Sequence, residues 1–181
     1  MSITEYIRRW WQRKGFGIQS KTDYAFLHDV VRETHPYYAY EEWQRRYPDA
    51  PPEEHALARL LLRIANSLQP ATARIHGNHT PLIVEAINSG CRRTAVEESD
   101  TPYFRLWQAM LPAKAVGGPV IEFITDKAAH HSTEAMVLTH IHTNNAHLWR
   151  QLLDGRAITY DMRHTGIAII RQDRYPEHYQ I

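Results

Sequence analysis

The stretch Ser67–Ser99, SLQPATARIHGNHTPLIVEAINSGCRRTAVEES, predicts a strand, a tight loop, a helix and a second strand. Arg74–His76 end a short β-prone run. Pro81 is favoured as the first helical residue because its missing N–H would have no partner there. Gly90 is a typical helix C-cap residue, and a second β-prone run begins at Arg93–Val96. A strand–loop–helix–strand unit of this length is the first half of a nucleotide-binding α/β fold.

The bulk composition narrows the class of protein. The chain has 181 residues, enough for one domain with a hydrophobic core and a helical appendage. A formal net charge of +1 gives no electrostatic argument for nucleic acid. No apolar run reaches the roughly 20 residues of a membrane helix. The single cysteine, Cys91, excludes an internal disulfide and fits a reducing compartment. We therefore expect a cytoplasmic protein without nucleic-acid or membrane partners, in which Cys91 is a packing residue.

Proline punctuation divides the chain into two expected parts. The run Pro48–Pro52 separates a helical N-terminal region, residues 1–52, from an α/β domain, residues 53–181. The α/β domain begins with a strong helix over 53–68. Near the start of the chain, aromatic and aliphatic side chains recur at helical spacing. We expect that helical face to dock on the domain, and the alternative is a surface helix that binds an anionic membrane or nucleic acid.

The remainder of the chain alternates between strands and helices. The run at 135–138 is apolar on both faces, which is typical of a central parallel strand. The last two β runs are too close for a crossover and must form an antiparallel hairpin. The expected class is α/β with a mostly parallel, Rossmann-like sheet that ends in an antiparallel hairpin. The expected elements are a helix over 100–111, strands at 120–124 and 135–138, a helix from Asn144 or Asn145, and strands at 157–160 and 166–170.

Four stretches of the sequence carry a family resemblance: Gly15–Ser20 followed by Phe26 and Val30, Leu61–Gly77, Ile141–Leu153 and Arg156–Gln180. In these stretches the chain resembles a shortened class I S-adenosylmethionine-dependent methyltransferase, of a bacterial group with an extra helical N-terminus. Lys21 stands where the N-terminal signature of that group, Gly-x-Gly-x-His-Ser-Pro, has its proline. The resemblance runs in order along nearly the whole chain and implies a methyltransferase-type sheet with one strand–helix unit missing.

The same resemblance implies where S-adenosylmethionine would bind. Gly77 matches the first glycine of the family's cofactor turn, and Glu97 matches the acid that binds the ribose hydroxyls. Asn78 tolerates the left-handed conformation of such a turn, whereas His79 crowds the backbone approach that glycine permits. The carboxylate that ends the first strand in the family is replaced by Ile75. The implied cofactor site is therefore degenerate.

Histidines follow the expected strand ends, where open α/β sheets bind their ligands. In the family, paired acids follow the fifth strand; here Thr139 and His140 occupy that place. His140 or His142 is a candidate general base, because the unperturbed pKa of imidazole lies near neutrality. Together with His76 and His79 they are also candidate metal ligands, although their spacing matches no strong zinc motif. The third interpretation is that polar loops simply tolerate histidine; His130 and His131 in the polar segment 125–134 belong to the same pattern.

Three functions remain open from these residues. The first is a degenerate methyltransferase-like protein that has lost its cofactor and serves as a binding or scaffold protein for a small molecule or another protein. The second is an active S-adenosylmethionine-dependent enzyme that methylates a small hydroxyl or amine. The third is a protein with a histidine-bound metal. An exposed sheet edge left by the missing unit predicts a homodimer.

Overall fold

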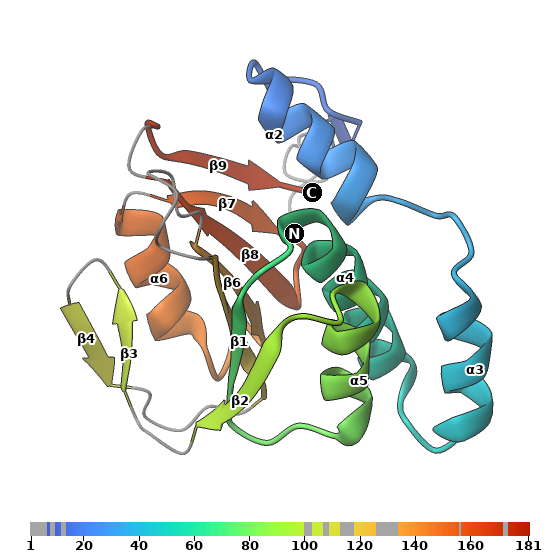
Figure 1. Ribbon diagram of the computed structural model, residues 1–181. Helices are drawn as coiled ribbons and strands as arrows, with labels where there is room; N and C mark the ends of the chain where they lie inside the picture. The colour runs from blue at the N-terminus through green and yellow to red at the C-terminus, as the bar shows by residue number, and fades with distance from the viewer. Residues whose placement is uncertain are drawn as a thin grey trace. The chain divides into compact units, whose positions relative to one another are not determined.

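The computed structural model describes residues 7, 10, 11, 14–99, 103–106, 109–112, 118–125, 134–155, 157–171 and 174–181. The chain divides into two compact units, coloured along the sequence in Figure 1. The helical unit consists of Met1–Pro70, Thr80–Thr94 and Gln180–Ile181. The sheet unit consists of Ala71–His79 and Ala95–Tyr179.

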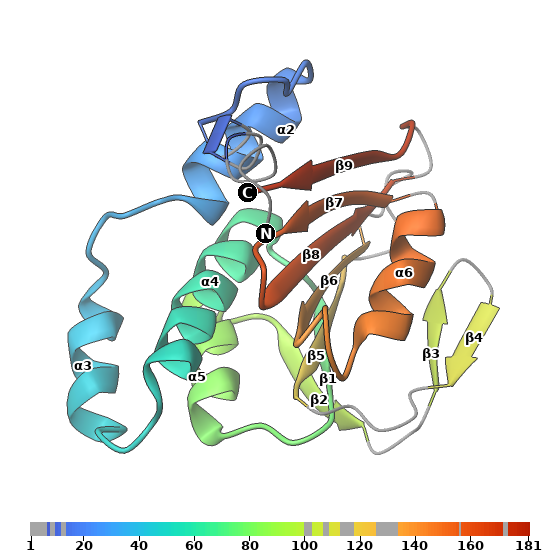
Figure 2. The ribbon, with the colours of Figure 1, turned by 180° about the vertical axis from the view of Figure 1, so that it is seen from behind.

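The helical unit is built around two long helices, α4 and α5, which lie side by side in both views (Figures 1 and 2). Both were predicted from the sequence, and a proline opens each of them. At Gly90 an added Cβ would lie 2.2 Å from the carbonyl oxygen of Leu62, so only glycine allows this approach between the helices. The elements of the unit are α2 (Lys21–Phe26), the π-helical turn η1 (Leu27–Val31), α3 (Tyr38–Arg46), α4 (Pro52–Leu68) and α5 (Pro81–Gly90).

The start of the chain departs from the expected docking. Trp10 and Trp11 are 46% and 51% exposed, so their helical face is not buried on the domain. The Lys14 ammonium lies 3.9 Å from the centroid of the Trp10 ring.

The sheet unit contains a seven-stranded sheet in the order β2-β1-β5-β6-β8-β7-β9 and a separate two-stranded sheet, β3-β4. A single helix, α6 (Ala146–Asp154), belongs to this unit among the described residues. The strands are β1 (Thr72–His76), β2 (Ala95–Ser99), β3 (Tyr103–Leu106), β4 (Ala109–Pro112), β5 (Val120–Ile124), β6 (Glu134–Thr139), β7 (Ala157–Asp161), β8 (Thr165–Ile170) and β9 (Glu177–Gln180).

The sheet is mixed, and the expectation of a mostly parallel sheet is wrong. Strands β1 and β2 are paired in parallel, whereas β5 is antiparallel to both β1 and β6, and β8 is antiparallel to both β6 and β7. A parallel crossover needs a dozen or more residues, and the chain between Ile124 and Glu134 is shorter than that. The strand at 135–138 is central, as expected, but antiparallel to both neighbours. The terminal hairpin of β7 and β8 is confirmed.

Two further elements differ from the sequence prediction. The helix expected over residues 100–111 is wrong, because β3 and β4 form an antiparallel pair there. Tyr103 and Phe104 are strand-forming residue types, and pairing between the two short runs overrides their apolar spacing. The last strand, β9, was not predicted; it lies beside β7, where Tyr179 and Tyr160 rings are 5.3 Å apart.

The register brings several strand ends to one edge of the sheet. Paired residues on neighbouring strands point to the same face. One such row contains His76, Val120, Leu138, Gly166 and Asp161. The carboxyl ends of β1, β2, β6 and β7 therefore meet at this edge, together with the amino ends of β5 and β8.

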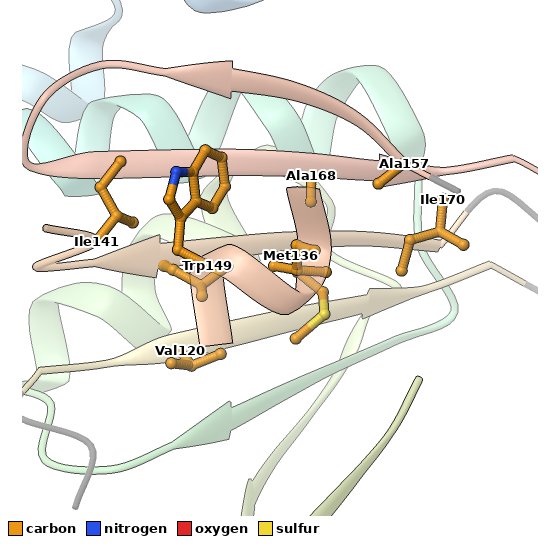
Figure 3. Packing of buried hydrophobic residues seen from close by; sticks show 9 residues of the cluster. Val120, Met136, Ile141, Trp149, Ala157, Ala168 and Ile170 are labelled. Atoms are coloured by element: carbon orange, nitrogen blue, oxygen red, sulfur yellow. The ribbon is translucent and has the colours of Figure 1, made fainter. Parts of the chain in front are cut away.

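Helix α6 covers part of one face of the sheet with an apolar core (Figure 3). Trp149 projects from the helix and is 3% exposed. The residues of this cluster are Val120, Met136, Leu138, Ile141, Trp149, Leu152, Ala157, Ala168 and Ile170. No helix within the described residues has the length and apolar character needed to cross a membrane.

Strand β2 is one edge of the large sheet, and it carries two consecutive glutamates, Glu97 and Glu98. Charged residues protect an edge strand from pairing with another chain. This edge is therefore protected against strand pairing, and the homodimer expected from the sequence stays a prediction.

Candidate functional site

The loop after β1 begins with Gly77, the glycine at which the sequence predicted a turn. Gly77 has a φ of 84°, a conformation that residues with a Cβ rarely adopt, so glycine is required there. Asn78 is exposed. Ile75 is a buried strand residue at 1% exposure. The loop begins like a cofactor turn, but the strand before it ends in an apolar side chain.

His79 turns back onto this loop. Its Nδ1 lies 3.1 Å from the carbonyl oxygen of Gly77, and its Nε2 lies 3.5 Å from Oε1 of Glu98. Because a carbonyl oxygen only accepts hydrogen bonds, Nδ1 is the donor in the first contact. The side chain of His79 is 13% exposed, whereas that of Glu98 is 71% exposed. The imidazole therefore packs against the loop backbone instead of leaving the turn open.

Glu97, the candidate ribose acid, is engaged by an arginine of the neighbouring strand. Arg74 Nη2 and Nε lie 3.1 and 3.2 Å from Oε2 of Glu97. Arg74 and Glu97 are register partners on β1 and β2, so the contact joins directly opposed residues. Two charge-assisted hydrogen bonds to one carboxylate oxygen are stronger than neutral ones. The carboxylate that the sequence assigned to a ligand is thus neutralised by the protein itself.

The charged contacts continue into the sheet on the other side of Arg74. Its Nη1 lies 3.4 Å from Oε2 of Glu122, the register partner of Arg74 on β5. His76 Nε2 lies 3.6 Å from the same oxygen. Glu122 and His76 are 5% and 1% exposed, so both are removed from solvent. Arg74, Glu97 and Glu122 lie in one register row, and His76 contacts the same Glu122 oxygen; we call these four residues the β1 network.

A second histidine–carboxylate pair lies at the same edge of the sheet. His142 Nε2 lies 3.3 and 3.2 Å from the two carboxylate oxygens of Asp161. Asp161 is buried at 6% exposure and also accepts a 2.8 Å hydrogen bond from the backbone N–H of Arg163. The side chain of His142 is 52% exposed. The carboxylate is fixed by the protein, and the imidazole that it orients faces solvent.

His140, the other candidate base, is placed differently. It has a φ of 55°, and its carbonyl oxygen accepts hydrogen bonds from the backbone of Thr143 and Asn145. A Cβ on Gly118 would lie 2.6 Å from His140 Nδ1, so the imidazole packs against a position that only glycine can fill. His140 therefore shapes the turn after β6, and His142 is the better placed of the two for proton transfer.

The predicted histidines do not converge on one point. His76 and Asp161 are four strands apart in the same register row, which is roughly 19 Å at the usual 4.8 Å strand spacing. Within the described part of the chain, no three histidine, cysteine, aspartate or glutamate side chains gather as a metal site would require. His130 and His131 lie outside the described residues. The described histidines give the metal hypothesis no support.

Sequence reasoning missed Arg74, Glu122 and Asp161. Glu122 carried a usable signal, because a glutamate in the middle of the apolar run Val-Ile-Glu-Phe-Ile requires a buried partner. Arg74 carried a weaker one, in the alternation of Thr72, Arg74 and His76 along β1. Cys91 is buried at 4% exposure and its Sγ contacts Gln69, which supports its assignment as a packing residue.

Comparisons with protein-family models, with curated proteins and with solved structures found no match to this chain.

Proposed function

We propose that this protein is a methyltransferase-like binding protein that does not hold S-adenosylmethionine. It presents the carboxyl edge of its sheet, from the β1 loop to the β7 end, to a small molecule or another protein. The proposal rests on the sequence resemblance and on the way in which the chain's own side chains occupy the positions that the cofactor would need.

The contact between Arg74 and Glu97 carries the proposal. An acid that binds ribose hydroxyls must offer free carboxylate oxygens at the end of the second strand. In this chain the Glu97 Oε2 atom accepts two hydrogen bonds from Arg74, and Arg74 is itself held by Glu122. Moving Arg74 aside would remove the cation from Glu122, which is buried, and would leave that carboxylate poorly compensated.

The loop after β1 supports the same conclusion. A glycine-rich turn works because the backbone can approach the ligand closely. Here the His79 imidazole donates to the Gly77 carbonyl oxygen, and the side chain of Ile75 cannot accept a hydrogen bond. The residues present do not fit an adenosyl group.

The strand order suggests how such a protein is related to nucleotide-binding folds. Doubly wound sheets have the order 3-2-1-4-5-6 and bind ligands at the carboxyl ends of strands 1 and 4. The run β2-β1-β5-β6 matches the segment 2-1-4-5 of that order, with β5 reversed. Reversal brings the amino end of β5, instead of a carboxyl end, beside β1. The Rossmann-like ancestry of the sheet is therefore part of the proposal, and so is the loss of its ligand crevice.

Isothermal titration calorimetry with S-adenosylmethionine tests the proposal. At 2 mM ligand we expect no saturable heat from the purified protein. A dissociation constant below about 0.1 mM would overturn it. Titration of the Glu97→Gln variant is the matched control, because a genuine ribose contact would weaken on this change while an incidental surface interaction would not.

The pair of His142 and Asp161 favours a second candidate, an active enzyme. Asp161 orients the His142 imidazole through Nε2, which leaves Nδ1 to take a proton from a substrate hydroxyl or amine. Incubation with the labelled methyl donor and a panel of small phenols and amines tests this candidate. Methyl transfer that is lost in His142→Ala but retained in His140→Ala would establish it, and no turnover in any arm would reject it.

A further inference from the structure

The helical unit contains a cleft that the sheet edge does not involve. Its volume is about 350 Å³, within the range of small-molecule sites. It lies between the end of α3, the loop that follows and the first turns of α4. The lining residues are Gln44, Pro48, Ala50, Pro52, His55, Ala56 and Arg59.

Arg59 supplies a positive charge to this cleft. Its guanidinium carbon lies 5.0 Å from the centroid of the Tyr40 ring, an attraction that fixes the orientation of the cation without neutralising it. Tyr40 is in turn packed against Trp43, which is 1% exposed, with ring centroids 5.7 Å apart. The guanidinium therefore rests on a rigid aromatic base.

Two other arginines of the helical unit have their charge compensated by oxygen atoms of the protein. Arg46 pairs with Glu42 and Glu85, and Arg63 donates to the carbonyl oxygens of Val30 and Val31. Among the described residues, no ion pair and no hydrogen bond to an oxygen is found for Arg59, although it is partly buried. An arginine held by an aromatic ring and left without an oxygen partner is prepared to receive an anion from outside.

The remaining groups of the cleft fit an anion attached to a small apolar body. His55 Nε2 donates to the carbonyl oxygen of Tyr47 at 3.1 Å, which holds the imidazole at the cleft wall. Gln44 offers an amide. Ala50, Ala56 and the two prolines provide apolar surface with little conformational entropy to lose. No glutamate or aspartate lines this cleft.

We infer that this cleft binds a small oxyanion, a carboxylate or a phosphate group carried on a compact apolar body. Arg59 is the residue that contacts the oxyanion, and the alanine and proline side chains contact the body. This site is separate from the sheet edge, so it stands whether or not the proposed function is correct.

The probes are benzoate, its neutral analogue benzamide, and phenyl phosphate, each titrated into the ¹⁵N-labelled full chain and followed by NMR. We expect saturable shifts of the amides of Ala50, Ala56 and Arg59 with benzoate or phenyl phosphate, and at least tenfold weaker binding of benzamide. The stronger of the two anions identifies the oxyanion as a carboxylate or a phosphate.

Variants sharpen the test. Arg59→Gln should weaken binding of the anion at least tenfold, whereas Arg45→Gln, an exposed arginine of α3 that is not part of the cleft, should leave it unchanged. Equal binding of benzoate and benzamide, an unaltered affinity in Arg59→Gln, or no shifts at 50 mM anion would each overturn the inference. The comparison of benzoate with benzamide uses the unmodified protein, so it decides the matter even if the variant is unstable.

Discussion

Two halves of one face of the sheet differ sharply in chemistry. On β6 and β8 this face is apolar and lies under α6, where Val120 of β5 and Ala157 of β7 join the same cluster. On β2, β1 and β5 the same face carries the β1 network. A single register row crosses from one half to the other, from Arg74 and Glu122 to Met136 and Ala168. The change from charged to apolar takes place in one step, between Glu122 and Met136.

This difference in chemistry separates buried residues whose role is to pack the fold from buried residues that packing alone does not explain. Packing alone accounts for the apolar half, because its side chains fill the space beneath α6. The charged half includes Glu122 and His76, both buried. Buried ion pairs contribute little net stability, because removing the charges from water offsets their attraction. We therefore attribute the network to the candidate site, where Arg74 occupies an oxygen of the Glu97 carboxylate.

The largest effect is expected in the apolar half. Trp149→Ala removes the side chain at the centre of the α6 contact and leaves a cavity, so the free energy of unfolding should fall by about 3–5 kcal/mol. Leu153→Ala, on the same helix but only partly buried, is the control and should cost distinctly less. Denaturant titration followed by circular dichroism measures both. Equal losses would show that α6 does not pack on the sheet through Trp149.

An intermediate effect is expected in the charged half. Glu122→Ala removes the carboxylate that contacts Arg74 and His76, and we expect a loss of about 3 kcal/mol, because the change breaks an ion pair whose carboxylate is buried. Glu97→Ala removes an exposed partner of the same arginine and should cost less than about 1 kcal/mol. The same denaturant titration distinguishes them. A neutral Glu122→Ala would mean that the network is not buried as described.

The smallest effect concerns the contact between Tyr37 and Glu33, a hydroxyl–carboxylate pair that belongs to the helical unit and not to the sheet. The Tyr37 hydroxyl donates to Glu33 Oε2 at 2.8 Å, and burial together with this contact raises the pKa of Tyr37 to about 12. The unfolded chain ionises this group near 10. Stability from the protonated hydroxyl is therefore complete below pH 10 and is lost as the pH rises toward 12.

Unfolding measured at pH 9 and pH 11 checks this sign. The wild-type protein should lose more stability across that interval than Tyr37→Phe, which has no hydroxyl to ionise. Identical losses in the two proteins would show that Tyr37 titrates in the folded state as it does in the unfolded chain.

The sequence predicted the local elements well, because their signals are local. Proline at the start and an apolar face along the length placed α4 and α5, and the spacing of two β runs required the hairpin of β7 and β8. The direction of β5 was wrong, because strand direction depends on the connections and on partners far along the chain. The connection after Ile124 is too short for a parallel crossover, so β5 and β6 run in opposite directions.

From the sequence, the candidate site could be predicted only as a list of residues, without the contacts between them. From the loop after β1, His79 contacts Gly77 and Glu98, whereas Glu97 lies in the middle of β2, opposite Arg74. What could not be read from the sequence was that Arg74 would lie between Glu97 and Glu122, because cross-strand pairing decides which side chains meet. The same reason hid Asp161, which His142 meets across the sheet edge.

The central claim is that Arg74 and His79 leave no room for an adenosyl cofactor beside Glu97. It is tested most directly by ¹H–¹⁵N NMR of the wild-type protein with 5 mM S-adenosylmethionine. The account predicts that the backbone amides of residues 76–79 and 97–98 keep their positions throughout the titration. Saturable movement of these amides, reversed by competition with S-adenosylhomocysteine, would contradict it.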